Sequence, residues 1–228
     1  MIASPIGNLG DLSPRAADAL RDADLWFVED TRVSARLAAH LGIRKPMRIV
    51  NEHTSTKALS EYVLEIEAGA QAVLLTDAGA PAISDPGAML ADLCHEAGLR
   101  VDALPGPSAV TTALMASGFF AQRFAFLGFL PRKPGPMREE LAPFADSPLT
   151  LVLFESPHRA DKLLGTLYDA LGVRRYAICR ELTKVHQQVY RERLPHIPTE
   201  KAVPRKGEWT VVVEGRRRSF EASERTEV

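Results

Sequence analysis

The chain has 228 residues, enough for one large domain or two small ones. Its 28 basic and 29 acidic residues leave a formal net charge of −1, so the overall charge indicates no particular partner, although local clusters can still matter. No apolar run approaches the roughly 18 residues that a membrane-spanning helix needs, and the amino-terminal residues lack a secretory signal pattern.

The two cysteines, Cys94 and Cys179, lie far apart in apolar patterns and form no Cys-x-x-Cys motif. We expect both to be small core residues of a protein in the reducing cytoplasm. The histidines lack the spacing of a zinc site, so no metal is predicted.

Short apolar runs alternate with helical patterns in the first half, which favours βαβ units and a parallel sheet. The expected strands are residues 25–28, 47–50, 72–75 and 100–104. Helices are expected from Ser13 and Pro14, at residues 34–41, at residues 56–68 and at residues 88–97.

The second half has a different order. A small-residue helix is expected at residues 108–117. Strands are expected at residues 124–130, 149–154, 176–183, 187–193 and 209–214, and a helix that ends at residue 171 follows the second of these strands. Residues 131–136 read as a loop rich in proline and basic residues. We expect a domain boundary near Gly118, giving domains 1–117 and 118–215, and a polar, disordered tail at 216–228.

An acid-bearing loop follows the predicted strand 72–75. In open α/β sheets, ligands bind at the carboxyl ends of such strands. Gly79 allows close approach of a ligand, and prolines stiffen the loop. Asp77 and Asp85 suit a cationic or hydroxyl-rich ligand better than a phosphate. The alternative is a tight strand-to-helix connection in which the aspartates cap the helix.

Similar polar loops follow most of the predicted strands. They are residues 4–11, 29–32, 104–109, 155–159, 180–184 and 205–208. For residues 29–32, capping of the next helix is the alternative. No dinucleotide fingerprint, Walker motif or nucleophile elbow occurs. Together the loops favour a ligand cleft between two domains.

Taken in order, these motifs resemble the tetrapyrrole-methylase superfamily, and most closely its branch of ribosomal RNA small-subunit (cytidine-2′-O)-methyltransferases. The resemblance spans residues 2–215. Its pieces are Ser4-Pro5-Ile6-Gly7-Asn8-Leu9, Glu29-Asp30-Thr31-Arg32, Thr76-Asp77-Ala78-Gly79-Ala80-Pro81, Ile83-Ser84-Asp85-Pro86-Gly87, Pro105-Gly106-Pro107-Ser108-Ala109, Gly128-Phe129-Leu130-Pro131, Glu155-Ser156-Pro157-His158-Arg159, Arg180-Glu181-Leu182-Thr183-Lys184 and Lys206-Gly207-Glu208. The family has a full apolar strand before the first motif, whereas here only Met1 to Ala3 precede Ser4, so either the start is assigned late or this strand is unusually short.

The resemblance implies two α/β domains, with a mostly parallel N-terminal sheet, a mixed C-terminal sheet and S-adenosylmethionine bound in the cleft between them. It also implies a homodimer. The cofactor contacts carried over from the family are Pro5, Asp77, Ala78, Gly79, Ile83, Ser84, Ser108, Ala109, Glu155, Ser156 and Leu182.

The activity implied is 2′-O-methylation of a cytidine in 16S ribosomal RNA, with the assembled small subunit as the expected substrate. Arg32 and Lys184 are the candidates for catalytic cations that favour the alkoxide. Candidate RNA contacts are Arg132, Lys133, Arg159 and Lys206. Phosphate binding is the alternative role for Arg32 and Lys184, and ion pairing within their own clusters is a second alternative.

Two other functions remain open from the sequence. The same superfamily methylates carbon atoms of tetrapyrrole precursors, and such a site also needs cations. A non-catalytic protein that binds the cofactor or the ribosome is the third reading.

Overall fold

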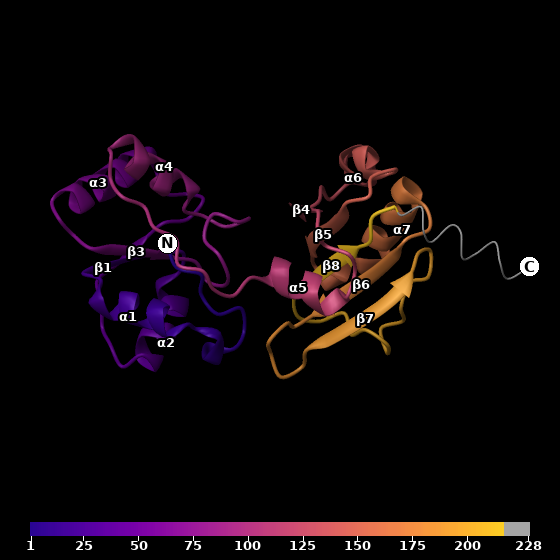
Figure 1. The fold of residues 1–228 in the computed structure, drawn as a ribbon, viewed down its shortest axis with the longest axis horizontal. Coiled ribbons are helices and arrows are strands. Elements are labelled where there is room, and N and C mark those ends of the chain that lie inside the picture. The colour runs from indigo at the N-terminus through magenta and orange to yellow at the C-terminus, as the bar shows by residue number, and fades with distance from the viewer. Residues whose placement is uncertain (217–228) are drawn as a thin grey trace, which may run out of the picture. The chain divides into compact units, whose positions relative to one another are not determined.

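The computed structural model describes residues 1–216 and divides the chain into two compact units, Met1–Ser108 and Ala109–Val228 (Figure 1). Residues 217–228, nearly all of the tail that we expected to be disordered, lie outside the described residues. The units divide before α5 (Ala109–Ser117), earlier than the boundary expected near Gly118. The reason is packing, because α5 contacts β6 and β8 of the second unit.

The first unit has a three-stranded parallel sheet in the order β2-β1-β3, as the alternating pattern predicts. Its elements are η1 (Leu9–Asp11), α1 (Pro14–Asp22), β1 (Leu25–Val28), α2 (Thr31–His40), β2 (Met47–Ile49), α3 (Thr56–Glu67), β3 (Ala72–Leu75) and α4 (Ala88–Glu96). The strand expected at residues 100–104 is absent from this part of the structure. Only an isolated parallel bridge forms there, between Ile2 and Leu104.

Helices pack on both faces of this sheet. Trp26 and Val28 of β1 lie in one apolar cluster with α1 and α2, while Leu25 and Phe27 lie in another with α3 and α4. Both faces are therefore buried, which explains why β1 reads as a continuous apolar run without alternation.

Local signals fix where the helices start. The Ser13 hydroxyl accepts a hydrogen bond from the Ala16 amide at 3.2 Å, and Pro14 occupies the first turn of α1. Asp30 caps α2 by accepting from the Arg32 amide at 2.8 Å. The capping role expected within residues 29–32 is thus present.

The second unit has a mixed five-stranded sheet in the order β4-β5-β8-β6-β7. Its elements are α5, β4 (Phe124–Phe129), α6 (Pro134–Leu141), η2 (Ala142–Phe144), β5 (Thr150–Glu155), η3 (Pro157–Arg159), α7 (Ala160–Leu171), β6 (Arg175–Arg180), β7 (Gln188–Arg193) and β8 (Trp209–Val213). β4 and β5 are parallel and the remaining pairs are antiparallel. Because β8 inserts between β5 and β6, the strands do not form the simple meander that their sequence order suggests.

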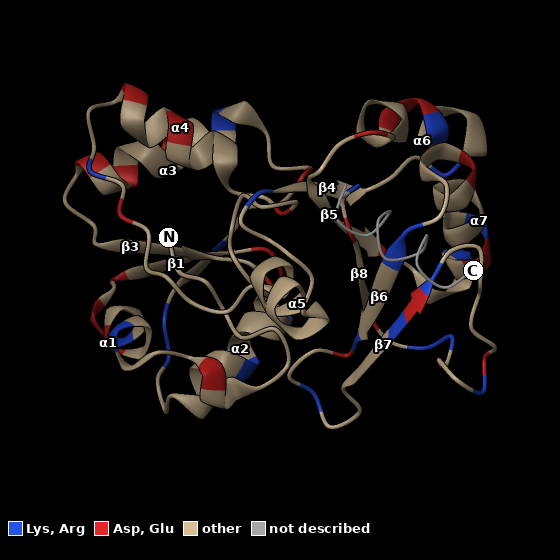
Figure 2. Cartoon of the chain, turned by 45° about the vertical axis from the view of Figure 1, so that its right-hand side comes forward, with Lys and Arg blue, Asp and Glu red and all other residues tan. Residues whose placement is uncertain are grey.

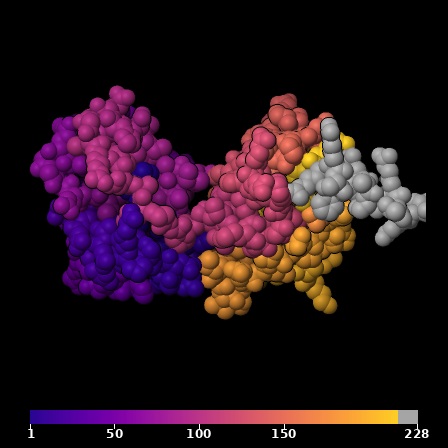
Figure 3. All heavy atoms as spheres, viewed as in Figure 1, coloured from indigo at the N-terminus to yellow at the C-terminus, as the bar shows by residue number. Residues whose placement is uncertain are grey.

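The prediction of a loop at residues 131–136 is partly wrong, because α6 begins at Pro134. A proline at the first helical position loses no hydrogen bond there and has a suitable φ. Met137 and Leu141 of α6 are fully buried against the core that α7 also covers. On the other face of the sheet lies α5, and Figure 3 shows its atoms and those that follow, in pink, over much of the near face of this unit.

Cys94 and Cys179 are buried free thiols, as expected. Within residues 1–216, no helix is both long enough and apolar enough to cross a membrane.

Candidate functional site

Two motifs far apart in the sequence are joined by their main chains in the first unit. The Ser4 amide donates to the Gly79 carbonyl at 2.8 Å, and the Gly79 amide donates back to the Ser4 carbonyl at 3.0 Å. The Ser4 hydroxyl also donates to the Thr76 carbonyl at 3.0 Å. These bonds hold Pro5 beside the loop that follows β3. Gly79 has φ +82, and a Cβ there would lie 3.5 Å from the Ile6 side chain.

The rest of this loop has an unusual backbone. Ala82 and Ser84 both have positive φ, at 68° and 58°, although neither is a glycine. Gly87 has φ +116, and a Cβ there would lie only 2.8 Å from Leu74. Such strained conformations cost stability and tend to persist at functional sites. The loop therefore presents Ile83 and Ser84 to solvent in one imposed shape.

Carboxylates crowd at the same strand ends. Glu29 accepts a hydrogen bond from the Asp77 amide at 3.2 Å, and the Thr76 hydroxyl lies 3.4 Å from Asp85. Burial, reinforced by the charge of Glu29, raises the pKa of Asp77 and raises that of Asp85 to about 6. A bound cation would lower both pKa values, because it favours the charged carboxylates.

Arg32 is paired with the cap of its own helix. Its guanidinium donates to both carboxylate oxygens of Asp30, at distances from 2.5 to 3.1 Å, and its side chain is 88% exposed. These hydrogen bonds hold the pKa of Asp30 at about 2. The structure thus shows the ion pair that the sequence left open, on an exposed and accessible side chain.

Lys184 lies between two carboxylates, each at 3.1 Å, from Glu181 and Glu208. Burial alone would lower the pKa of Lys184, but hydrogen bonds to both carboxylates outweigh it and raise the pKa. This arrangement therefore favours the protonated form of Lys184.

Gly207 is what allows this arrangement, and its role was not predicted. It has φ +80, and a Cβ there would lie 2.5 Å from the Glu181 carboxyl group. The Glu208 amide donates to Glu181 at 2.9 Å. Glu181 and Thr183 themselves have positive φ, at 50° and 65°. In the sequence, only the motif Lys206-Gly207-Glu208 indicates the close approach of Gly207 to Glu181.

Glu155 and Arg159 form a second buried arrangement. The Glu155 side chain is 1% exposed, lies 3.4 Å from the Arg159 guanidinium and has a raised pKa because of burial. Arg159 also donates to the carbonyls of Leu130 and Pro131, at 3.2 and 3.1 Å. Arg159 thus anchors the start of the basic loop, residues 131–133 before α6, and its contact with RNA stays a prediction.

The other predicted RNA contacts, Arg132, Lys133 and Lys206, are exposed. Lys162 on α7 donates to the Arg132 carbonyl at 2.5 Å and so holds the loop of Arg132 and Lys133 in place. Lys162 was not predicted, although it lies one helical turn after Arg159. Figure 2 shows basic and acidic residues interspersed over both units.

The remaining predicted cofactor contacts lie at the ends of helices and strands or within the loops described above. Ser108 ends the first unit and Ala109 begins α5. Ser156 precedes η3 at the end of β5, its amide donating to Glu155 at 2.7 Å. Leu182 is buried between the positive-φ residues Glu181 and Thr183. Ala78 is exposed beside Asp77.

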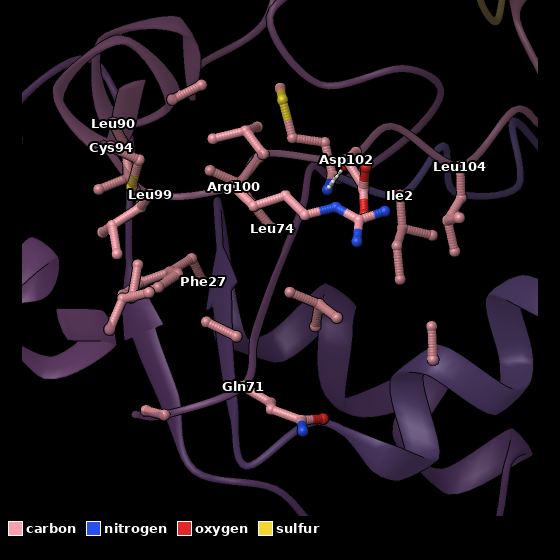
Figure 4. A pocket seen from close by; sticks show the side chains of 18 residues that line it. Ile2, Phe27, Gln71, Leu74, Leu90, Cys94, Leu99, Arg100, Asp102 and Leu104 are labelled. Carbon is pink, nitrogen blue, oxygen red and sulfur yellow. Dashed lines mark hydrogen bonds and ion pairs between the residues drawn. The ribbon is translucent and has the colours of Figure 1, made fainter. Parts of the chain in front are cut away.

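A cavity of about 640 Å³ lies elsewhere in the first unit (Figure 4). It is lined mainly by apolar side chains near the amino end of β3 and along residues 99–104, among them Phe27, Leu74, Leu90, Cys94 and Leu99. The amino group of Met1 donates to the Asp102 carbonyl at 2.7 Å, and burial lowers its pKa. None of the predicted site residues lines this cavity.

Among residues 1–216, no group of three or more His, Cys, Asp or Glu side chains is arranged to hold a metal ion.

Comparison with known proteins identifies the family. The profile described as Tetrapyrrole (Corrin/Porphyrin) Methylases matches residues 1–198. This chain belongs to the tetrapyrrole methylase family. S-adenosylmethionine is the methyl donor of that family, so the family and the cofactor class predicted from the sequence are confirmed.

Curated relatives lie in the ribosomal RNA branch. A protein named ribosomal RNA small subunit methyltransferase I from Mycobacterium tuberculosis (strain H37Rv) is 46% identical over 216 residues, covering 93% of this chain and 76% of the relative. One from Xylella fastidiosa (strain Temecula1) is 41% identical, covering 94% and 80%. One from Thermotoga maritima is 39% identical, covering 95% and 97%.

Solved structures share the fold at much lower identity. The methyltransferase CobJ aligns with a TM-score of 0.68 at 17% identity, covering 95% of both chains. Uroporphyrin-III C-methyltransferase from Thermus thermophilus, complexed with S-adenosyl homocysteine, aligns with a TM-score of 0.63 at 19% identity, covering 92% of this chain and 95% of the other. The predicted fold class is confirmed.

Replacing Asp85 by Asn should stabilise the protein at neutral pH. The folded state raises the pKa of this carboxyl from 3.8 to about 6, so it binds the proton more tightly than the unfolded state does. The free energy of unfolding therefore falls as pH rises from about 4 to about 6. We expect Asp85→Asn to be more stable by about 1 kcal/mol at pH 7, after allowing for partial exposure, and unchanged below pH of about 4.

Urea unfolding across this pH range measures the effect. The exposed Asp22→Asn substitution on α1 is the control and should show no such trend. Equal stability of Asp85→Asn and the parent at pH 7 would contradict the raised pKa.

Proposed function

We propose that this chain transfers the methyl group of S-adenosylmethionine to the 2′-hydroxyl of a cytidine in 16S ribosomal RNA. The observation that carries the proposal is the strand-end loop tied to Ser4, in a chain 39–46% identical to relatives named as ribosomal RNA small subunit methyltransferases. Methylation of ribosomal RNA is the broad activity, and the cytidine ribose is its finer assignment.

The loop after β3 has features that fit this cofactor. S-adenosylmethionine carries a sulfonium and an ammonium cation, and a cation would lower the raised pKa values of Asp77 and Asp85 in this loop. Gly79, which has φ +82, fixes the bend of this loop where its main chain pairs with that of Ser4. Ile83, 48% exposed, offers an apolar surface for a nucleoside. We assign cofactor contacts here to Pro5, Asp77, Ala78, Gly79, Ile83 and Ser84.

In the second unit we assign cofactor contacts to Ala109, Glu155, Ser156 and Leu182, with Ser108 preceding them. The buried Glu155 side chain lies 3.4 Å from Arg159, and its Oε2 is buried without a hydrogen-bond partner, so a ligand can satisfy this atom. The Thr183 hydroxyl beside Leu182 is buried without a hydrogen-bond partner, which marks a polar group that a ligand can satisfy.

When bound, S-adenosylmethionine supplies an electrophilic methyl group, so the chain must position and activate the acceptor hydroxyl. A ribose hydroxyl is a weak nucleophile, and a nearby cation stabilises the alkoxide that develops. Lys184, with its raised pKa, fits the role of a protonated cation and not that of a base. Arg32 is permanently charged and exposed.

RNA binding requires basic groups that face solvent. Arg132, Lys133 and Lys206 meet this requirement, whereas Arg159 serves by holding the loop of Arg132 in place. We place this activity in the cytoplasm, on the assembled small subunit.

Carbon methylation of a tetrapyrrole precursor is the second candidate. It is favoured by the solved structure named uroporphyrin-III C-methyltransferase, but this protein is only 19% identical and establishes the fold alone. The relatives at 39–46% identity weigh against it.

The proposal predicts tritium transfer from labelled S-adenosylmethionine to small ribosomal subunits. We expect label in the 2′-O-methylcytidine fraction after nuclease digestion, and none in uroporphyrinogen incubated in parallel. Label in uroporphyrinogen alone would favour the second candidate. Cofactor binding without transfer to subunits, naked RNA or uroporphyrinogen would favour a non-catalytic protein.

Gly79→Val should abolish binding of S-adenosylmethionine. At φ +82 a β-branched residue is strained, and its branched side chain would occupy the approach that we assign to the ligand. Calorimetry measures the affinity. Gly98→Val is the control, because Gly98 has φ +71 in open space after α4 and suffers similar strain away from the loop. A folded Gly79→Val protein with the parent affinity would contradict the assignment.

Arg32→Ala and Lys184→Ala should keep cofactor affinity but lose methyl transfer. A residue that stabilises the alkoxide should lower turnover at saturating RNA by about a hundredfold. A residue that contacts only phosphate should instead weaken RNA binding and reduce the salt slope by about 0.7 to 0.9. The exposed Lys57→Ala on α3 is the control. Unchanged methyl transfer in both variants would show that Arg32 and Lys184 serve only in the ion pairs seen in the structure.

A homodimer is the expected assembly. Met115 and Phe120 are 75% and 44% exposed and offer apolar surface near α5. Light scattering at micromolar concentration should give twice the mass of the chain, 50 kDa as against 25.0 kDa. A mass of one chain would contradict the dimer.

A further inference from the structure

Phe129 is an exposed aromatic residue whose direction is imposed by an irregularity in its strand. The register between β4 and β5 shifts between Phe126 and Gly128, and Gly128 has φ +60. In a regular strand, Phe126 and Phe129 would point to opposite faces. The extra residue of this bulge instead turns Phe129 to the face of Phe126, opposite Phe154.

The ring of Phe129 is supported on one side only. Its centroid lies 5.6 Å from that of Phe154, which in turn lies 4.9 Å from Phe126. Phe129 is nevertheless 63% exposed. The three rings, tilted against one another by 57° and 67°, thus form a platform whose end ring, Phe129, is exposed.

Cations follow this platform directly in the chain. Arg132 and Lys133 are exposed, and their loop is held by three side-chain hydrogen bonds to main-chain carbonyls. Two of these come from Arg159 and one from Lys162. An aromatic surface and two cations are therefore fixed within five residues of chain.

We propose that Phe129 is a stacking platform for an unpaired nucleobase of the RNA substrate, with Arg132 and Lys133 contacting the phosphates beside that base. Single-stranded RNA is recognised by stacking on aromatic side chains, while basic residues follow its backbone.

The register gives this platform a place in the proposed reaction. Phe129 lies opposite Phe154, and Phe154 is followed at once by Glu155 and Ser156, which we assign to the cofactor. A base held on Phe129 would bring its ribose toward the end of β5. The inference rests on the proposed function, since it assumes an RNA substrate.

The test is fluorescence anisotropy of a labelled, cytidine-containing single-stranded RNA with the full chain. Phe129→Ala should weaken binding by at least about tenfold and leave the salt slope unchanged, because no phosphate contact is lost. Phe129→Tyr should retain the affinity, since it keeps the ring. Phe124→Ala is the matched control, because Phe124 is a 43% exposed aromatic at the other end of β4.

Other outcomes would overturn the inference. Unchanged RNA affinity in Phe129→Ala would exclude stacking. Loss of S-adenosylmethionine affinity in calorimetry, with RNA affinity retained, would assign the ring to the cofactor. Tritium transfer by the parent protein to small subunits separates this inference from the proposed function. If the parent methylates RNA and Phe129→Ala binds RNA normally, the proposed function stands and only the stacking platform is wrong.

Discussion

The pair of main-chain hydrogen bonds between Ser4 and Gly79 is the constraint on which the first unit's candidate site depends. It joins the segment before α1 to the loop after β3, so Pro5 and Asp77 are brought together mainly by main-chain bonds, with the Ser4 hydroxyl adding one to the Thr76 carbonyl. Side chains at these positions therefore remain available for a ligand. The same pairing explains the glycine, because its φ of +82 is costly for other residues.

The second unit uses charged side chains for the equivalent task. Lys184 is held between Glu181 and Glu208, and Arg159 between Glu155 and two carbonyl groups. A charged residue at a strand end is thus first a candidate for holding its loop. Exposed cations without such a task, Arg132, Lys133 and Lys206, are the better candidates for binding an anion.

Local signals made much of this fold predictable. Apolar runs gave β1 and β3 to the residue, and the serine and proline at Ser13 and Pro14 gave the start of α1. Non-local features were not predictable. In the first unit, the apolar stretch at residues 100–104 forms only a bridge to Ile2. In the second unit, β8 lies between β5 and β6 through pairings that no local pattern encodes. The site behaved likewise. Its motifs located the loops and left open the ion pair of Lys184 with Glu181, but they did not indicate the pair of Lys184 with Glu208 or that of Arg159 with Glu155.

The two units also differ in the charge that their loops offer. Loops of the first unit gather Glu29, Asp77 and Asp85, whose crowding and burial raise the pKa values of the two aspartates. The basic loop of the second unit presents Arg132 and Lys133 in a fixed frame. Carboxylates suit a cationic methyl donor, and exposed basic residues suit a polyanionic RNA. A net charge of −1 conceals these local clusters, which is why composition alone indicated no partner.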